Sequence, residues 1–182
     1  MSTSEHVLRS NIHSEWTLYD GIDSFSAFKD LLKGLKEAQD GDSIELKINC
    51  PGGRCDVGMM IVQAIQQTKA VVVCNVVYPS HSMGSIIALA GDYLIMQPHS
   101  FLMFHTYSGG TYGKSGDMIK DVAYTDEALK GMMDDIVRPF LSKAEIARMH
   151  KGDDLYIKAS DPTLETRLKR HFKDISFTQK TS

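Results

Sequence analysis

Hydrophobic and polar residues alternate along the chain with two different periods, one typical of helices and one typical of strands. Apolar residues recur at helical spacing over residues 25–38, with Ser24 able to cap the start and Gly41 following the end. Over residues 44–48 every second residue is apolar, which predicts a half-buried strand. That strand ends at Pro51-Gly52-Gly53, a sequence that requires a turn.

The same alternation of helix and strand continues through the middle of the chain. Asp56 can cap a helix that runs through Gln67, and the β-branched residues that follow predict a buried strand over 70–77. A small-residue apolar helix is expected over 83–90, and two short strands over 93–96 and 101–104. Repeated strand–helix units predict an α/β fold with parallel strands.

The last third of the pattern is mainly helical. After a glycine-rich polar loop at 106–116, a long helix of mixed polarity is expected over 117–137. Ser142 and Glu145 have the spacing of a capping box for a short helix through His150, and a terminal helix is expected over 163–172. With 182 residues, of which 42% are apolar, the chain predicts one domain, residues 1–182.

Charge and composition exclude several classes of function. The net charge is −3 and acids and bases are mixed along the chain, so neither a nucleic acid nor a membrane is an expected partner. The N-terminus lacks the apolar stretch of a signal peptide, which predicts a soluble, cytoplasmic protein. Cys50, Cys55 and Cys74 are odd in number and lack zinc-ligand spacing, so they are interpreted as buried apolar residues, and no metal or cofactor is predicted.

Two residues at strand ends are candidates for catalysis. Ser82 lies between a buried strand and a helix, where its hydroxyl would be exposed and the next N–H could donate to an oxyanion. The alternative is that Ser82 only caps the helix. His105 follows an apolar strand at the sheet edge where functional groups gather, although a histidine there can also be structural. His81 ranks below His105 because neighbours on a turn tend to point apart.

Three segments resemble the proteolytic subunit of the Clp protease family, which consists of serine peptidases. The first is Ile48-Asn49-Cys50-Pro51-Gly52-Gly53, with cysteine where the family usually has serine. The second is Ser82-Met83-Gly84 with the helix that ends at Gly91, and the third is Phe104-His105 ahead of Gly109-Gly110. The segments occur in the family's order and at similar spacing. The resemblance covers roughly residues 44–159.

The resemblance implies a role for individual residues. Ser82 would be the nucleophile, His105 the general base and Asp154 the orienting acid, because residues 154–159 are similar to the family's segment after its aspartate. Asp153 is the alternative acid, since a shift of one residue would exchange the two. The backbone N–H groups of Gly53 and Met83 would form the oxyanion hole. No cofactor is implied.

The resemblance also implies a fold and partners. The expected fold is the spiral of strand–helix units that Clp peptidases share with crotonases, with a protruding helical handle at 117–137. Polypeptide substrates, a homo-oligomer of stacked rings and an ATP-dependent unfoldase are the implied partners. The chain departs from the family before Ile44, where only 16–19 is a candidate first strand, and at Lys151-Gly152, where an arginine is missing. The departures are typical of a viral or otherwise specialised member.

Two other functions remain open from the sequence. A crotonase-like acyl-CoA enzyme would have the same spiral and a backbone oxyanion hole but no catalytic serine. A catalytically inactive, ring-forming scaffold would keep the fold without turnover, and His81 in place of the usual alanine is compatible with that alternative. Labelling by a fluorophosphonate probe and peptidase activity distinguish these possibilities.

Overall fold

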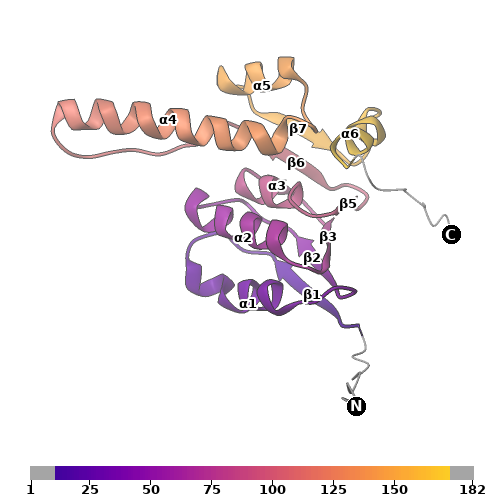
Figure 1. The fold of residues 1–182 in the computed structure, drawn as a ribbon. Helices are drawn as coiled ribbons and strands as arrows, with labels where there is room; N and C mark the ends of the chain where they lie inside the picture. The colour runs from indigo at the N-terminus through magenta and orange to yellow at the C-terminus, as the bar shows by residue number, and fades with distance from the viewer. Residues whose placement is uncertain (1–10, 173–182) are drawn as a thin grey trace, which may run out of the picture.

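Two β-sheets form the centre of the computed structural model, which describes residues 11–172 (Figure 1). The larger sheet has four parallel strands in the order β1-β2-β3-β5. They are β1 (His13–Leu18), β2 (Ser43–Ile48), β3 (Val71–Val76) and β5 (Tyr93–Met96). The smaller sheet has the order β4-β6-β7, in which β4 and β6 are parallel and β7 is antiparallel to β6. Its strands are β4 (Ser80–His81), β6 (Phe101–Phe104) and β7 (Leu155–Lys158).

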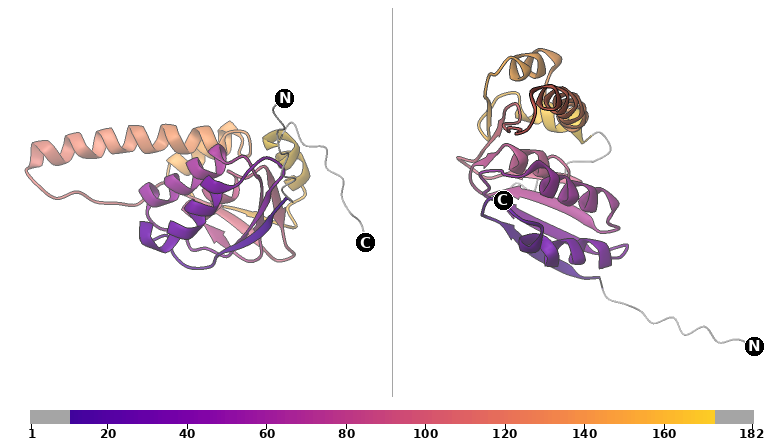
Figure 2. Two further views of the ribbon diagram at one scale, coloured as in Figure 1. Left: turned by 60° about the horizontal axis from the view of Figure 1, so that its bottom comes forward. Right: turned by 90° about the vertical axis from the view of Figure 1, so that its left-hand side faces the viewer.

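Helices return the chain between the parallel strands. The 3₁₀ helix η1 (Phe25–Phe28) and α1 (Lys29–Glu37) connect β1 to β2, and α2 (Cys55–Gln67) connects β2 to β3. Helix α3 (Met83–Ala88) follows β4. The three α-helices lie side by side along one face of the larger sheet in all views (Figures 1 and 2). The predicted α/β fold with parallel strands is therefore confirmed.

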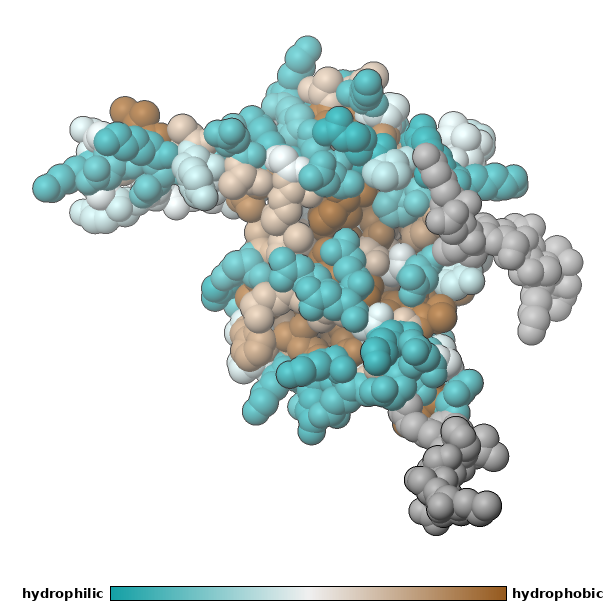
Figure 3. Space-filling model, in the orientation of Figure 1, coloured by the Kyte–Doolittle hydropathy of each residue, from teal (hydrophilic) through white to brown (hydrophobic). Residues whose placement is uncertain are grey.

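The hydrophobic core lies between this helical layer and the larger sheet, and it continues to the smaller sheet and to the ends of α4 and α5 that face it. Ile44, Leu46 and Ile48 of β2 are buried, as their alternation with polar residues predicts. Cys50 and Cys74 are buried, in agreement with their interpretation as small apolar residues, whereas Cys55 is only partly buried and packs against the margin of the core. In the space-filling view, apolar residues are visible between the helices, and hydrophilic residues cover much of the surface around them (Figure 3).

The last third of the described chain packs beside the smaller sheet. It contains α4 (Ser115–Val137), α5 (Lys143–His150) and α6 (Leu164–His171). Helix α4 projects from the body, and its buried residues, Met133 and Val137, are near its C-terminal end (Figures 1 and 2). The capping box of α5 is present, with the Ser142 side chain accepting from the N–H of Glu145. None of the described helices is both long enough and apolar enough to span a membrane.

Three local predictions need correction. The helix expected over 25–38 is split into η1 and α1, and the side chain of Ser24 forms no cap hydrogen bond. Asp56 lies in the first turn of α2, where it pairs with Arg54, the residue at the N-cap. A first strand is present: β1 pairs in parallel with β2 and includes part of the 16–19 candidate.

Candidate active site

The nucleophile candidate, Ser82, lies on a sharp turn between β4 and α3. Its backbone angles are φ 53° and ψ −124°, a conformation that L-residues rarely adopt and that costs about 1–3 kcal/mol. Ser82 is at the N-cap of α3, yet its side chain forms no cap hydrogen bond. The capping alternative is therefore not supported, and the half-exposed hydroxyl has no structural partner within the described chain.

Glycines allow the chain to pack closely around this turn. A Cβ atom on Gly84 would lie 2.8 Å from the Ser80 hydroxyl and 3.0 Å from the Cβ of Cys50. A Cβ atom on Gly52, where φ is +93°, would lie 2.8 Å from the Cβ of Ser82. The glycine loop after β2 therefore runs directly against the serine turn, and a larger side chain at either position would force the two apart.

Strand pairing brings His105 to the same edge of the smaller sheet as Ser82. His81 is paired with Met103 in the parallel ladder of β4 and β6, and the N–H of Ser82 donates to the carbonyl of Met103 at 2.8 Å. His105 follows the last residue of β6, Phe104, at this edge. Both candidates thus lie at the carboxyl ends of neighbouring parallel strands, where the side chains of such folds gather to form sites.

The antiparallel strand β7 brings Asp154 to this edge as well. The ladder ends at the pair of Phe104 with Leu155, and continuing its register by one step would set His105 opposite Asp154. The alternative acid, Asp153, is held by Arg148, whose Nε lies 2.8 Å from Oδ2 of Asp153. This ion pair favours Asp154 as the carboxylate available to His105.

The three side chains share one edge of the sheet without being hydrogen-bonded to one another. Ser82, His105 and Asp154 all lie among the described residues, and no hydrogen bond joins any two of them. His105 is half-buried and Asp154 is exposed. Hydrogen bonds of a catalytic site are often long or misaligned without substrate and shorten in the complex. The backbone positions of Ser82, His105 and Asp154 are therefore compatible with the predicted roles of hydroxyl, imidazole and carboxylate in acyl transfer, which the structure leaves as predictions.

The two backbone N–H groups predicted to bind an oxyanion, those of Gly53 and Met83, donate no backbone hydrogen bond within residues 11–172. The bridge between Ile22 and Gly53 uses the carbonyl of Gly52 and the N–H of Arg54, each at 2.8 Å from Ile22, and leaves the N–H of Gly53 unused. The N–H of Met83 lies in the first turn of α3, where it has no partner within the helix. Both amides thus remain candidates for an oxyanion hole.

His81 has a different environment from His105. Its ring contacts the ring of Phe101 edge-on, with 5.3 Å between the centroids. Phe101 in turn contacts Tyr156 of β7, at 5.8 Å between centroids. His81 is therefore packed into an aromatic row across the smaller sheet, in agreement with its lower rank as a base.

An open cleft of about 550 Å³ lies between the start of α2, the loop after β6 and α4. Its walls are the start of α2 at Arg54, the 107–111 loop after His105, and one side of α4 at Asp121. Two of its walls therefore begin close in sequence to Gly53 and His105, whereas Ser82, His105 and Asp154 are not among its lining residues.

The sequence analysis did not identify Ser85, a buried residue that connects the elements carrying Ser82 and His105. Its hydroxyl donates to the carbonyl of Ser80 at 2.6 Å and accepts from the N–H of Met103 at 3.1 Å. Ser85 therefore joins α3 to β4 and β6, the strands that lead to Ser82 and His105. Its one signal in the sequence is a polar residue inside an otherwise apolar helix, which does not reveal its partners.

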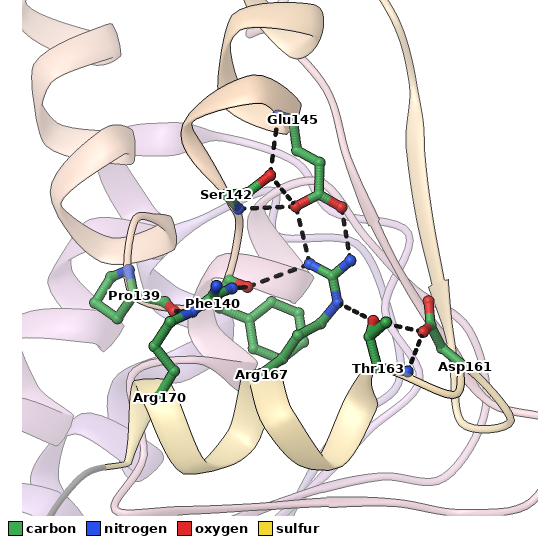
Figure 4. A network of polar contacts seen from close by, with 8 residues as sticks. All are labelled: Pro139, Phe140, Ser142, Glu145, Asp161, Thr163, Arg167 and Arg170. Carbon is green, nitrogen blue, oxygen red and sulfur yellow. Dashed lines mark hydrogen bonds and ion pairs between the residues drawn. The ribbon is translucent and has the colours of Figure 1, made fainter.

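A network of polar contacts supports α5, the helix that precedes Asp154 (Figure 4). Arg167 of α6 binds Glu145 at the start of α5, and Arg170 donates to the carbonyls of Pro139 and Phe140 in the connection between α4 and α5. Thr163 links Arg167 to Asp161. Helix α6 thus fixes the start of α5, and sequence periodicity predicted the helices but not these contacts.

Comparisons with known proteins agree with this geometry. The family model for Clp protease matches residues 16–151, about three quarters of the chain. ATP-dependent Clp protease proteolytic subunit 1 of Gloeobacter violaceus is 33% identical over 123 residues, which are 65% of this chain and 61% of that protein. The ATP-dependent Clp protease proteolytic subunit of Deinococcus radiodurans is 36% identical over 77 residues, 41% of this chain and 38% of that protein.

These matches have limits that bear on the site. The chain spans less than two thirds of the length of both relatives. Ser82, His105, Gly53 and Met83 lie within the segment that the family model matches, whereas Asp154 lies three residues beyond it. The assignment of Asp154 therefore depends on the pairing of β6 with β7 rather than on the family match.

Proposed function

Because the chain belongs to the Clp protease family, we propose that it is a serine endopeptidase that hydrolyses unfolded or dedicated protein substrates. Ser82 attacks the carbonyl carbon of the peptide bond, and His105 takes the hydroxyl proton and returns it to the leaving amine. Asp154 holds the imidazole in the tautomer that this transfer needs. Water then hydrolyses the acyl-enzyme with His105 again as base.

The oxyanion of each tetrahedral intermediate is bound by the N–H groups of Gly53 and Met83. Gly53 directly follows Gly52, the residue of the glycine loop that packs against Ser82, and Met83 begins the first turn of α3. Loss of one such donor typically lowers the rate about 100-fold to 1,000-fold. The cleft between α2 and α4 receives the substrate chain.

A single observation carries the proposal: Ser82 adopts a strained backbone conformation with no cap hydrogen bond. A serine that only capped the start of α3 would accept a hydrogen bond from a backbone N–H of the first turn and would need no positive φ. Strain of this kind is typical of a nucleophile presented at the end of a strand. The pairings of β4, β6 and β7 supply the other two side chains at the same edge.

The proposed enzyme is a homo-oligomer of stacked rings. Helix α4 supports this assignment, because it projects from the body and exposes apolar side chains that a monomer would leave in water. Ile119, Val122 and Tyr124 are 71%, 50% and 76% exposed. In the proposed assembly α4 is the handle that joins two rings, and an ATP-dependent unfoldase supplies the substrate chains.

Covalent labelling tests the nucleophile directly. The purified protein is treated with a fluorophosphonate probe and the adduct is located by peptide mapping, while hydrolysis of short unstructured peptides is measured in parallel. We expect an adduct on Ser82, and loss of both labelling and hydrolysis in Ser82→Ala. Ser160→Ala, which changes an exposed serine outside the cleft, is the matched control.

Other outcomes would favour a different function. An adduct on another serine would overturn the assignment of Ser82, His105 and Asp154 together. Turnover of an acyl-CoA without labelling would favour a crotonase-like enzyme. Rings observed by native mass spectrometry, with neither labelling nor peptide hydrolysis, would favour an inactive scaffold.

A further inference from the structure

His150 and Asp134 join the last turn of α5 to the base of α4. Nε2 of His150 lies 2.8 Å from Oδ1 of Asp134, and the two side chains are 24% and 18% exposed. The other carboxylate oxygen, Oδ2, accepts from Nη2 of Arg138 at 3.3 Å. The carboxylate is thus held from two sides, in the part of α4 that packs against the body through Met133 and Val137.

The imidazole of His150 is suited to this contact as a fixed donor. Its Nδ1 atom is buried and has no hydrogen-bond partner among the described residues. A proton on Nε2 makes this nitrogen the donor to the carboxylate of Asp134, which has no proton of its own to donate. The hydrogen bond between His150 and Asp134 therefore has a defined direction, and it fixes the position of the C-terminal end of α5 relative to α4.

The connection from His150 to Asp154 is short, and backbone hydrogen bonds to the end of α5 fix its conformation. After α5, the N–H of Lys151 donates to Arg148 and that of Gly152 to Met149, at 3.0 and 2.9 Å. Gly152 has φ +101°, the left-handed conformation of a helix end closed by glycine. The N–H of Asp153 also donates to the carbonyl of Arg148, at 3.2 Å. Asp154 is the next residue, and β7 begins directly after it.

We propose that His150 and Asp134 are positioning residues, whose hydrogen-bonded pair fixes α5 on α4 and thereby holds Asp154 opposite His105. This inference rests on the proposed function, because it assigns the pair an effect on the carboxylate of the catalytic set. Neither residue touches the substrate. A displacement of Asp154 by about 1 Å would be enough to lower the rate, since misplacement of that size can cost about 100-fold.

Three variants separate a positioning role from a general effect on folding. His150→Ala removes the donor, whereas His150→Gln replaces Nε2–H by an amide N–H at a similar reach. Lys130→Gln is the matched control, because it breaks the Lys130–Asp126 ion pair on the same helix without affecting α5. The measurements are the rate of fluorophosphonate labelling of Ser82, and kcat and KM for a peptide.

We expect His150→Ala to lower kcat and the labelling rate about 10-fold to 100-fold with KM unchanged. His150→Gln should stay within about 3-fold of the wild type, and Lys130→Gln should match it. Wild-type values of kcat and of the labelling rate in His150→Ala would overturn the inference, and so would a His150→Gln variant as defective as the alanine variant.

Failure of the proposed function would be distinguishable from failure of this inference. If the wild type does not label on Ser82, the proposed function is wrong, and amide hydrogen exchange then decides whether the pair positions the loop. In that case faster exchange of residues 151–158 in His150→Ala than in Lys130→Gln would support the positioning role. Equal exchange in the two variants would overturn it.

Discussion

The guanidinium of Arg167 and the carboxylate of Glu145 form a two-bond ion pair between α6 and α5. Nη2 lies 2.6 Å from Oε1, and Nη1 lies 3.0 Å from Oε2. The same carboxylate accepts from the N–H of Ser142 at 2.8 Å and closes the capping box of α5. The planar fork of arginine matches a carboxylate in a way that the single ammonium of lysine does not. One residue therefore both caps a helix and joins it to another.

Removing one partner of this pair should destabilise the protein. We expect Arg167→Gln to lower the free energy of unfolding by about 1–3 kcal/mol, because the half-buried carboxylate of Glu145 loses two charge-assisted hydrogen bonds. Lys169→Gln on the same helix is the control: it breaks an exposed ion pair with Glu165 and should cost less than about 1 kcal/mol. Urea denaturation measures both. Equal effects of the two changes would contradict a special role for Arg167.

The same pair predicts a dependence of stability on pH. The hydrogen bonds from the Arg167 guanidinium hold the pKa of Glu145 at about 2, below its ordinary value of 4.5. Because the pKa is lower in the folded state, the stabilisation is complete above about pH 4.5 and is lost as the pH falls towards 2. Comparing the free energy of unfolding of the wild type and Glu145→Gln over this range isolates the contribution. Their difference should shrink as the pH decreases, and a constant difference would contradict the assignment.

Ser85 should matter for both stability and activity. Ser85→Ala leaves the carbonyl of Ser80 and the N–H of Met103 without the hydroxyl that joins them, so we expect a loss of about 1–3 kcal/mol. Activity should fall as well, since these strands carry Ser82 and His105. Ser100→Ala is a matched control, because the Ser100 hydroxyl is equally buried but has no hydrogen-bond partner in the described chain. Thermal unfolding and labelling rates of the two variants provide the comparison.

Much of the fold could be predicted because its strongest patterns are local. The period-2 alternation of β2 identified the strand to within one residue, and β5 and β6 have the predicted bounds. The spacing of Ser142 and Glu145 identified the start of α5, because a capping box is formed by side chains three residues apart. Local signals of this kind do not depend on the rest of the molecule.

Strands β1, β4 and β7 were harder to predict, because pairing with segments distant in sequence defines them. Strand β4 has two residues and exists through its pairing with β6, and β7 is recognised as a strand by its antiparallel pairing with β6. Strand β1 is mostly exposed, with one fully buried residue, Leu18, so its alternation carries a weak hydrophobic signal. Non-local pairing also reverses β7 relative to the otherwise parallel arrangement.

The candidate residues could be predicted from the sequence, but the backbone geometry and the distant contacts that position them could not. Ser82, His105 and Asp154 were selected by strand ends and by the family resemblance, and they remain predictions until labelling and mutation test them. Their context depends on backbone geometry and distant contacts: the φ of Ser82, the pairing of Phe104 with Leu155 and the contact of His150 with Asp134. No single-sequence pattern encodes a contact between residues so far apart in the chain.

The strained backbone conformation of Ser82 predicts that two variants without the hydroxyl, Ser82→Ala and Ser82→Gly, differ in stability. Ser82→Ala keeps a Cβ atom at φ 53°, whereas Ser82→Gly removes it and lets the backbone adopt this conformation freely. Relief of strain is worth about 1–3 kcal/mol, and the greater freedom of glycine in the unfolded chain offsets about 0.4–1 kcal/mol of it. We therefore expect Ser82→Gly to be more stable than Ser82→Ala by about 1 kcal/mol in urea denaturation, with neither variant labelled by the probe. Gly110→Ala is the reference for an open loop site, since no atom lies within 4 Å of a Cβ placed there. If Ser82→Gly is instead less stable than Ser82→Ala, the turn at Ser82 is not strained, and the observation that carries the proposed function is lost.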